Sequence, residues 1–496
     1  MLSVLLGVVV LVLTIAVYLK GIYNQYYWKK RGVAFYDKHK TGGPLWQFAI
    51  EDRSFFQILN DIYWKYEKEP AVGLGSFHDL GLYVKDPTNM QYIAQVDFHS
   101  FNNRGIAFTE EDVLAHNVLM LNGPKWKLVR QKVTPIFTTS KLKNMFYIID
   151  KSAQDFIEYL RENPDKLKGD LFDTLGNYCN AAIAAAVFGI HTRSIFDSPF
   201  RIMAKEVLTP TFFTNLKFAI NGVSESLFNL LKLKLFKTEK ENFFIAAIKQ
   251  AIRQREKENL KRHDFIDICV ELQKNGTMVD PDNGYTLDPT DELMAAQAYF
   301  FFLAGTDPTI AGIFGTLMEL GRHPEILKKS HEDVDSVLEK YNGQLTYDAV
   351  GEVKYLDNVL SEVFRLHPPI AFVTRKCEQD SVLPVGNIPV EKGVKIYMPI
   401  FELHHDPNYF PDPEKFDPDR FIRGEIDEAT YIPFGKGRRY CIGARYAKIQ
   451  IMTVLIHLLR HYTVRTFVRK GGVQYNKEQF QVRLRNCDVE LVPRKL

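Results

Sequence analysis

Ten residues near the C-terminus, Phe434 to Gly443, constrain this chain more than any other segment. They read Phe-Gly-Lys-Gly-Arg-Arg-Tyr-Cys-Ile-Gly, which places Cys441 among three glycines and two arginines, just before a helix-like run from Ala444 to Leu459. A buried thiolate needs nearby positive charge or backbone N–H groups, and arginines and a helix N-terminus supply both. Glycines let the backbone approach a flat ligand or a metal. The chain must therefore fold into a cradle for one cysteinate, and we expect Cys441 to bind a metal.

This segment resembles the haem-binding loop of the haem-thiolate monooxygenases, the cytochrome P-450 family. The family pattern is Phe-Gly-x-Gly-x-Arg-x-Cys-x-Gly, and every fixed position is met. The resemblance implies that Cys441 is the axial ligand of the iron of haem b, in a loop that includes Phe434, Gly435 and Gly443. The alternative is a structural cysteine beside a glycine-rich turn. Each fixed position of the motif that the sequence matches weakens this alternative.

The composition indicates a large body in a reducing compartment. The chain has 496 residues, 46% of them hydrophobic, with no linker-like stretch or internal repeat that would divide it. A formal net charge of +3 gives no support for a nucleic-acid partner. The five cysteines are scattered, odd in number and without CxxC spacing, which argues against a disulfide framework or a zinc ribbon.

The N-terminus carries a candidate membrane anchor. No charged side chain occurs from Leu2 to Leu19, a run that as a helix reaches roughly 27 Å and just spans a bilayer core. Basic residues only follow this run, first at Lys20, so the positive-inside rule predicts a lumenal N-terminus and a cytosolic body. A cleaved signal peptide is the alternative, but the chain lacks a basic n-region and a clear cleavage site. We expect an anchor (1–20), a linker (21–45) and a catalytic domain (46–496).

The body is predicted to be mainly helical. Apolar residues recur at helical spacing over 143–160, 291–322, 324–341 and 354–365. Short β-prone stretches occur at Val394–Met398 and Val489–Val492. The predicted fold class is mainly α (α+β). The resemblance, which covers nearly the whole chain, specifies a large helical body with small β-sheets around a buried haem.

A Glu-x-x-Arg pair is predicted to hold the body together. Glu362 and Arg365 lie one turn apart on a predicted helix, in a stretch that ends with two prolines. Alone, such a pair is usually a solvated surface bridge. The surrounding sequence resembles the family's signature helix, and Pro-Asp-Arg-Phe at 418–421 resembles the segment that supplies a third member, Arg420. The resemblance thus implies a structural Glu-Arg-Arg triad.

Several basic residues are candidates to bind the haem propionates, because carboxylates in an apolar slot need cations or hydrogen-bond donors. Trp126 and Arg130 match the family's Trp-x-x-x-Arg helix, and Arg375 and Arg439 lie where the family places propionate arginines. The alternative for each arginine is a surface position, which we accept only for Arg104, since no motif surrounds it.

The segment from Phe300 to Thr309 matches the family's central helix with one departure. The family has Ala/Gly-Gly-x-Asp/Glu-Thr here, and Asp307 matches the acid of a proton relay, but Pro308 replaces the threonine whose hydroxyl assists oxygen activation. A hydroxyl from Thr306 or Thr309, an ordered water or the substrate could fill the gap, and we predict catalytic roles for Asp307 and Thr309. The alternative is a proline kink in a core helix with Asp307 pointing to the surface.

The predicted substrate pocket is apolar, which suits a lipophilic substrate. By resemblance its residues are Phe301, Ala304, Ile370, Phe372, Val373 and Phe480, although each could equally belong to the core. Residues 211–213 and 227–236 are amphipathic with interspersed basic residues, a pattern typical of a segment that touches the bilayer or of a packed lid helix.

The resemblance implies a microsomal monooxygenase of the endoplasmic reticulum membrane, similar to the animal and insect branch that metabolises xenobiotics and hormones. It would insert one atom of O₂ into a lipophilic xenobiotic, hormone or lipid. NADPH–cytochrome reductase would deliver the electrons, with cytochrome b5 and membrane lipid as further partners. No Gly-x-Gly-x-x-Gly fingerprint follows a strand, so we expect no nicotinamide on this chain. The alternatives are a haem-thiolate isomerase or dehydratase that needs no O₂, suggested by Pro308, and a haem carrier or sensor.

Overall fold

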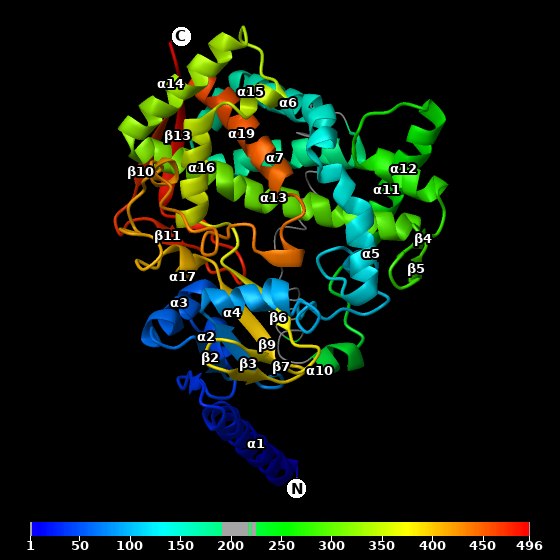
Figure 1. Ribbon diagram of the computed structural model, residues 1–496, viewed down its shortest axis with the longest axis vertical. Helices are drawn as coiled ribbons and strands as arrows, with labels where there is room; N and C mark the ends of the chain where they lie inside the picture. The colour runs from blue at the N-terminus through cyan, green and yellow to red at the C-terminus, as the bar shows by residue number, and fades with distance from the viewer. Residues whose placement is uncertain (1, 191–216, 218–219, 221–224, 496) are drawn as a thin grey trace.

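The computed structural model describes residues 2–190, 217, 220 and 225–495, and Figure 1 shows a helical body with its largest sheet at the lower end. The described helices are α1 (Leu2–Lys30), α2 (Gly43–Ile50), α3 (Phe55–Lys65), α4 (Pro87–Gln91), α5 (Gly123–Val133), α6 (Thr139–Glu162), α7 (Leu171–Phe188), α10 (Glu225–Leu230), α11 (Thr238–Glu258), α12 (Phe265–Lys274), α13 (Asp291–Arg322), α14 (Pro324–Lys340), α15 (Tyr347–Val350), α16 (Lys354–Leu366), α17 (Phe401–His404), α18 (Arg420–Arg423) and α19 (Ala444–His461). The predicted mainly α fold is confirmed.

The strands are short and form one five-stranded sheet and four two-stranded pairs among the described residues. They are β1 (Ala34–Phe35), β2 (Ala71–Leu74), β3 (Gly81–Val84), β4 (Met278–Val279), β5 (Thr286–Leu287), β6 (Phe372–Lys376), β7 (Ser381–Leu383), β8 (Ile388–Val390), β9 (Lys395–Pro399), β10 (Tyr462–Val468), β11 (Gln474–Tyr475), β12 (Leu484–Arg485) and β13 (Cys487–Pro493). The large sheet has the order β1-β2-β3-β9-β6, and β10 pairs antiparallel with β13. The two β-prone stretches of the sequence fall in β9 and β13.

The helix α13 is the central element of the body and lies across its middle in Figure 1. Thr290 caps it by accepting a hydrogen bond from the backbone N–H of Leu293, and Asp291 and Glu292 occupy its positive first turn. The four helices predicted from periodicity correspond to α6, α13, α14 and α16, with ends within four residues of the prediction. The sequence predicts these four helices because the apolar residues of each lie along one face, and that face packs on the core.

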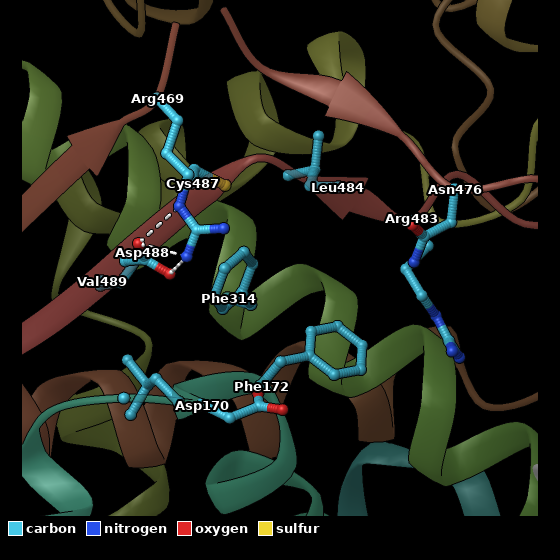
Figure 2. A pocket seen from close by; sticks show the side chains of 12 residues that line it. Asp170, Phe172, Phe314, Arg469, Asn476, Arg483, Leu484, Cys487, Asp488 and Val489 are labelled. Atoms are coloured by element: carbon cyan, nitrogen blue, oxygen red, sulfur yellow. Dashed lines mark hydrogen bonds and ion pairs between the residues drawn. The ribbon is translucent and has the colours of Figure 1, made fainter.

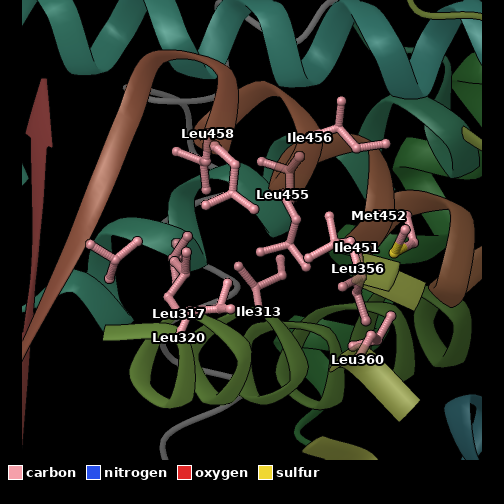
Figure 3. Packing of buried hydrophobic residues seen from close by; sticks show 14 of the residues in the cluster. Ile313, Leu317, Leu320, Leu356, Leu360, Ile451, Met452, Leu455, Ile456 and Leu458 are labelled. Atoms are coloured by element: carbon pink, nitrogen blue, oxygen red, sulfur yellow. The ribbon is translucent and has the colours of Figure 1, made fainter. Parts of the chain in front are cut away.

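The main core lies where α13, α16 and α19 meet. Figure 3 shows Leu317 of α13, Leu360 of α16 and Leu455 of α19 pointing into the same space, and all three are fully buried. Two glycines of α13, Gly312 and Gly315, allow these helices to approach, since a Cβ at either would lie 3.0 Å from a neighbouring side chain. This packing fixes α19, and with it the cysteine loop, relative to α13.

The helix α1 extends beyond the predicted anchor and docks on the body. It includes a candidate membrane span, Val8–Lys30, and in Figure 1 its N-terminal end projects from the molecule. Its C-terminal half is packed: Trp28 is fully buried against Gly73, and Asn24 Nδ2 donates to the carbonyls of Lys40 and Ser76. The predicted linker of residues 21–45 is therefore part of the folded body, through the end of α1, the strand β1 and the start of α2.

The second predicted membrane-contacting region is described only in part. Residues 211–213 lie outside the described residues. Within 227–236, Phe228 of α10 is fully buried, whereas Leu230 and Leu231 are exposed by 79% and 52%. Leu235, near the other end of this segment, is also buried, so both ends pack on the body while the two leucines between them remain exposed.

Candidate active site

The cysteine loop enters α19 through a tight turn that depends on glycine. Gly435 and Gly437 both have positive φ angles, +75° and +76°, which side chains disfavour. A Cβ on Gly437 would also lie 2.0 Å from the carbonyl oxygen of Ala94. The backbone N–H of Cys441 donates to the carbonyl of Phe434 at 3.0 Å, which closes the loop. Gly443 then caps α19, so the cysteine sits at the positive end of a long helix.

The side chain of Cys441 is exposed, yet it lies inside a dense part of the protein. Burial raises the pKa of its thiol, and a hydrogen bond from Gly443 and the positive charges of Arg130 and Arg104 oppose that rise. These three contributions all favour the thiolate. Burial still disfavours the Cys441 thiolate, and coordination to a metal cation would offset that cost.

Four arginines surround this cysteine loop: Arg104, Arg130, Arg375 and Arg439. Desolvation, together with repulsion from other members of the group, lowers the pKa of Arg104 to about 10, of Arg375 to about 9 and of Arg439 to about 7. A guanidinium keeps its proton in proteins. A buried cluster of this kind therefore requires an anionic partner.

Buried donors point to the same requirement. In the described part of the chain, Trp126 Nε1, Arg104 Nε and Arg375 Nε are buried and have no hydrogen-bond partner. Buried polar groups without partners are rare in folded proteins. The donor set of two guanidiniums and one indole N–H fits the propionates of a haem whose iron is held by Cys441.

Arg439 donates to several backbone carbonyls, and its role at the propionates stays a prediction. Its Nε and Nη2 atoms donate to the carbonyl oxygen of Asn102 at 3.1 and 2.8 Å, and Nη2 also reaches the carbonyl of Leu121 at 2.8 Å. Its guanidinium packs on the ring of Trp126, 4.1 Å from the centroid. Arg439 therefore ties the segment around Asn102 to the cysteine loop.

Arg104 corrects the interpretation as a surface residue. Its Nη2 donates to the carbonyl of Arg439 at 3.1 Å, and Thr374 donates to its carbonyl at 2.8 Å. Arg130 similarly donates to the carbonyl of Tyr440 at 2.8 Å. Nothing in the sequence around Arg104 marked it, because its partners are more than 250 residues away.

The predicted triad is assembled and buried. Both carboxylate oxygens of Glu362 accept hydrogen bonds from Arg365, at 2.8 and 2.9 Å, and Oε1 also accepts from Arg420 Nε at 3.0 Å. The three side chains are at most 2% exposed. Arg365 additionally donates to the carbonyl of His404, so the triad ties α16 to α17 and to the segment before α18.

On α13, the two threonines next to Pro308 do not share its face. Ala304 is exposed and Pro308 is half-buried, and at a spacing of four residues they lie on one stripe. Thr306 and Thr309 are at most 2% exposed, and the Thr306 hydroxyl donates to Asn180 and to the carbonyl of Phe302, on the side of the helix opposite Ala304. The catalytic role of Thr309 stays a prediction.

Asp307 lies beside the Ala304 stripe and is paired with an arginine that the sequence analysis did not single out. Arg483 Nη2 donates to both carboxylate oxygens of Asp307, at 2.8 and 2.9 Å. The Asp307 side chain is only 8% exposed, so the surface-pointing alternative is wrong. No local signal could have found this contact, which joins residues 176 positions apart.

The six predicted pocket residues divide into two groups. Phe301 packs against Phe137 and Phe265, and Phe372 packs against Phe55, so both belong to aromatic clusters of the core. The other four residues retain accessible surface: Ala304, Ile370, Val373 and Phe480. Because these four residues retain accessible surface, they are the better candidates for substrate contact. Ala304 also lies on the same face of α13 as Pro308.

Comparison with known proteins decides the family. Residues 38–484 match the cytochrome P450 family. This chain belongs to the cytochrome P450 family. It is 32% identical to the probable cytochrome P450 6a13 of Drosophila melanogaster, over 92% of both chains. It is 30% identical to cytochrome P450 6B6 of Helicoverpa armigera and 29% identical to cytochrome P450 6k1 of Blattella germanica, each over 92% of this chain and 91% of the relative.

Membership of the P450 family agrees with the chemistry of the site. P450 proteins bind haem through a cysteine thiolate, and Cys441 with its loop, the arginine cluster and the donors of Trp126 fits that group. The protein is accordingly a haem-containing oxidoreductase of the monooxygenase class, which takes a small-molecule substrate and requires a redox partner. A thiolate-ligated haem would supply the activation of dioxygen at this site.

Proposed function

We propose that this protein is a microsomal monooxygenase that inserts one oxygen atom into a lipophilic xenobiotic, hormone or lipid, with NADPH–cytochrome reductase as electron donor. The observation that carries the proposal is the complete cysteine loop, with Cys441 at the N-terminus of α19 and a cluster of arginines beside it. The relatives named above are insect P450 proteins, which supports a xenobiotic substrate.

In this proposal Arg375, Arg104, Arg130 and Trp126 bind the propionates, and Arg439 positions them. The support is the set of buried donors without partners on Arg104, Arg375 and Trp126, together with the brace that Arg439 forms with backbone carbonyls. Glu362, Arg365 and Arg420 stabilise the folded body, which breaking one buried pair would weaken by about 3–5 kcal/mol. Asp307 takes part in proton delivery during oxygen activation.

The proposed substrate site is formed by Ala304, Ile370, Val373 and Phe480. All four are apolar and partly accessible, which matches a lipophilic substrate. Because the Thr306 hydroxyl donates to Asn180 and to the carbonyl of Phe302, the remaining sources of the missing hydroxyl at Pro308 are Thr309, a water molecule and the substrate itself.

We further propose that α1 anchors the protein in the endoplasmic reticulum with the N-terminus in the lumen, and that lipid and cytochrome b5 are additional partners. The support is the exposed apolar part of α1 and the basic residues that follow it. Protease added to sealed microsomes should digest the body, and full protection of the body would contradict this orientation.

The function is tested by supplying purified protein with reductase and NADPH and screening lipophilic compounds for oxygenated products. We expect products that require both NADPH and O₂ and that contain one atom of ¹⁸O from labelled gas. A compound converted without NADPH or O₂ would favour the isomerase or dehydratase, the alternative suggested by Pro308. Haem binding without conversion of any compound would favour a carrier or sensor.

A further inference from the structure

The C-terminal end of α16 is tied to α13 by a buried hydrogen bond. His367 Nε2 lies 2.8 Å from a carboxylate oxygen of Glu319, both side chains are buried, and Nε2 is the donor because a carboxylate only accepts. Burial acts to raise the pKa of Glu319, but the hydrogen bond from His367 and the positive charge of Arg322 outweigh it, so the pKa is lowered. A bond to an ionised acceptor is stronger than a neutral one. This bond therefore holds the end of α16 in a fixed place on α13.

His367 is joined to Ile370, a candidate for substrate contact, by two prolines. The rings of Pro368 and Pro369 fix their φ angles, and a residue that precedes a proline is restricted to extended backbone. The link between His367 and Ile370 consequently has few soft torsions. A displacement of His367 is passed on to Ile370 because the link cannot absorb it.

The residues after His367 are paired with a segment near the C-terminus. The backbone N–H of Ala371 donates to the carbonyl of Phe480 at 3.0 Å, and that of Val482 donates to the carbonyl of Pro369 at 3.2 Å. Two of the four proposed substrate residues, at positions 370 and 480, are thus carried by one paired unit. We call this unit the wall, and it consists of residues 369–371 and 480–482.

A cavity next to the wall leaves room for it to move. Arg483 and Leu484, which directly follow the wall, border a cavity of about 590 Å³. Figure 2 shows Leu484 on the strand side of this cavity and Phe172 of α7 on the helix side. The Arg483 side chain extends towards α13 and pairs with Asp307 there, which attaches the C-terminal end of the wall. The place of the wall therefore depends on its attachments to α13.

We propose that Glu319 and His367 are positioning residues for the substrate site. Their hydrogen bond sets how far Ile370 and Phe480 reach into the site, and hence which shape of apolar substrate is accepted. The inference rests on the proposed monooxygenase function, in which Ile370 and Phe480 contact the substrate. His367 acts through the proline link, and Glu319 acts through His367.

The first test measures how two ligands of the haem iron bind to full-length, haem-loaded protein, from the shift of the Soret absorption. Imidazole occupies little space beyond the iron, whereas 4-phenylimidazole carries a ring that reaches further into the site. The ratio of the two dissociation constants therefore reports the wall. The constant for imidazole alone reports whether the haem and its cysteine are intact.

Three variants separate positioning from stability. His367→Leu removes the donor, and His367→Gln retains one because the amide nitrogen of glutamine lies near the position of Nε2. Arg322→Met is the matched control. Arg322 Nη1 donates to both oxygens of Glu319, at 2.9 and 3.1 Å, but Arg322 is not part of the link to Ile370.

We expect His367→Leu to weaken the binding of 4-phenylimidazole about 10-fold relative to imidazole. The wall would withdraw towards the cavity, and a misplacement of about 1 Å costs up to about 10²-fold. His367→Gln should restore most of the ratio, and Arg322→Met should resemble the wild type. An unchanged ratio in His367→Leu would overturn the proposal, as would equal changes in His367→Leu and Arg322→Met or a failure of His367→Gln to restore the ratio.

Hydrogen exchange gives a second readout that needs no ligand and no turnover. The backbone amides of Ala371 and Val482 report whether the wall stays paired. They should exchange at least about 10-fold faster in His367→Leu, since a bond to a charged group contributes about 1.5–3 kcal/mol to holding the wall closed. Exchange at the wild-type rate in this variant would contradict the role of His367.

Pro369→Ala provides an independent arm if His367→Leu does not fold. It softens the link but keeps both the bond to Glu319 and the carbonyl that accepts from Val482. We expect a change of about 3-fold in the ligand ratio, in the same direction, because the link gains conformational freedom. An unchanged ratio would overturn the proposal. Neither readout requires turnover, so a protein that oxygenates no compound would contradict the proposed function, and these two readouts would still decide the role of the wall.

Discussion

At the scale of the residue, this protein concentrates positive charge around one sulfur. Arg104 and Arg130 act on the Cys441 thiol, and Arg375 and Arg439 add to the same cluster. Each guanidinium is partly or fully desolvated. All four donate to backbone carbonyls, and Arg104 and Arg375 each keep, in addition, a buried Nε–H without a partner in the described part of the chain. Single substitutions should therefore separate support of the backbone from the binding of an anion.

Cys441→Ser should abolish the thiolate-type spectrum of the reduced carbon monoxide complex, because a hydroxyl is a harder and weaker donor to iron than a thiolate. Cys487→Ser is the matched control, since Cys487 is a partly exposed cysteine in β13 outside the loop. A thiolate spectrum that persists in Cys441→Ser would refute the assignment of the axial ligand.

Arg375→Gln and Arg439→Leu should both reduce haem content, but only the second should weaken the fold strongly. Arg439→Leu leaves the carbonyls of Asn102 and Leu121 without their donor, at about 1–3 kcal/mol for each buried group. Haem per protein and the apparent unfolding temperature measure the two effects. Normal haem content with altered product selectivity in either variant would contradict a role in holding the propionates.

At the scale of the element, α13 carries a proline in its interior. Pro308 has no N–H, so the carbonyl of Ala304, one turn earlier, lacks the backbone hydrogen bond that it would normally accept. This carbonyl lies on the face of α13 that is proposed to contact the substrate. The helix continues through this position because it is packed along most of its length, from Leu293 to Leu320. Tertiary packing thus tolerates a residue that costs about 3 kcal/mol in an isolated helix.

Pro308→Thr should raise the ratio of product formed to NADPH consumed, because the threonine supplies both an N–H and a hydroxyl on the stripe of Ala304. Pro308→Ala restores the N–H alone and is the control. Product, peroxide and NADPH are measured together. If the alanine variant matches the threonine variant, the backbone and not the hydroxyl governs coupling.

The short helix α17 contains a buried acid whose ionisation should make stability depend on pH. Burial raises the pKa of Glu402 from 4.5 to about 8, and both of its carboxylate oxygens are buried without a hydrogen-bond partner in the described part of the chain. Between these values the unfolded chain loses the proton and the folded protein keeps it, so stability falls as pH rises, by at most about 1.4 kcal/mol per pH unit. Unfolding of Glu402→Gln should lack this slope from pH 4.5 to 8. Parallel curves for the two proteins would contradict it.

At the scale of the whole molecule, the anchor and the catalytic body are joined without a free linker. Thr41 donates to the carbonyl of Val17 at 2.7 Å, Asn24 bonds to two loops, and Trp28 is fully buried. In the proposed anchoring, the docked half of α1 sets the orientation of the body on the membrane. The exposed Leu230 and Leu231 offer a second apolar contact.

Truncations should separate anchoring from folding. Removal of residues 2–16 should release much of the protein from membranes and leave the body intact, because the docked half of α1 remains. Removal of residues 2–30 should also destabilise the body by about 3 kcal/mol or more, since a buried tryptophan is lost. Membrane sedimentation and the reduced carbon monoxide spectrum measure the two effects. Equal stability of the two truncated proteins would show that the docking of α1 is dispensable.

The sequence by itself determined the features that depend on local pattern. The ten-residue loop identified Cys441, helical periodicity identified α6, α13, α14 and α16, and an uncharged run identified the exposed part of α1. Such features are readable because the residues that specify them are neighbours in the chain.

Only the tertiary structure decided which distant residues meet. In the structure Arg483 pairs with Asp307, and Arg439 donates to the carbonyls of Asn102 and Leu121. Arg104, predicted to be a surface residue, instead donates to the carbonyl of Arg439 within the site. The structure also assigned Phe301 and Phe372 to the core. Burial and charge pairing in these cases depend on residues 36 to 337 positions apart, and no periodicity or motif records such a contact.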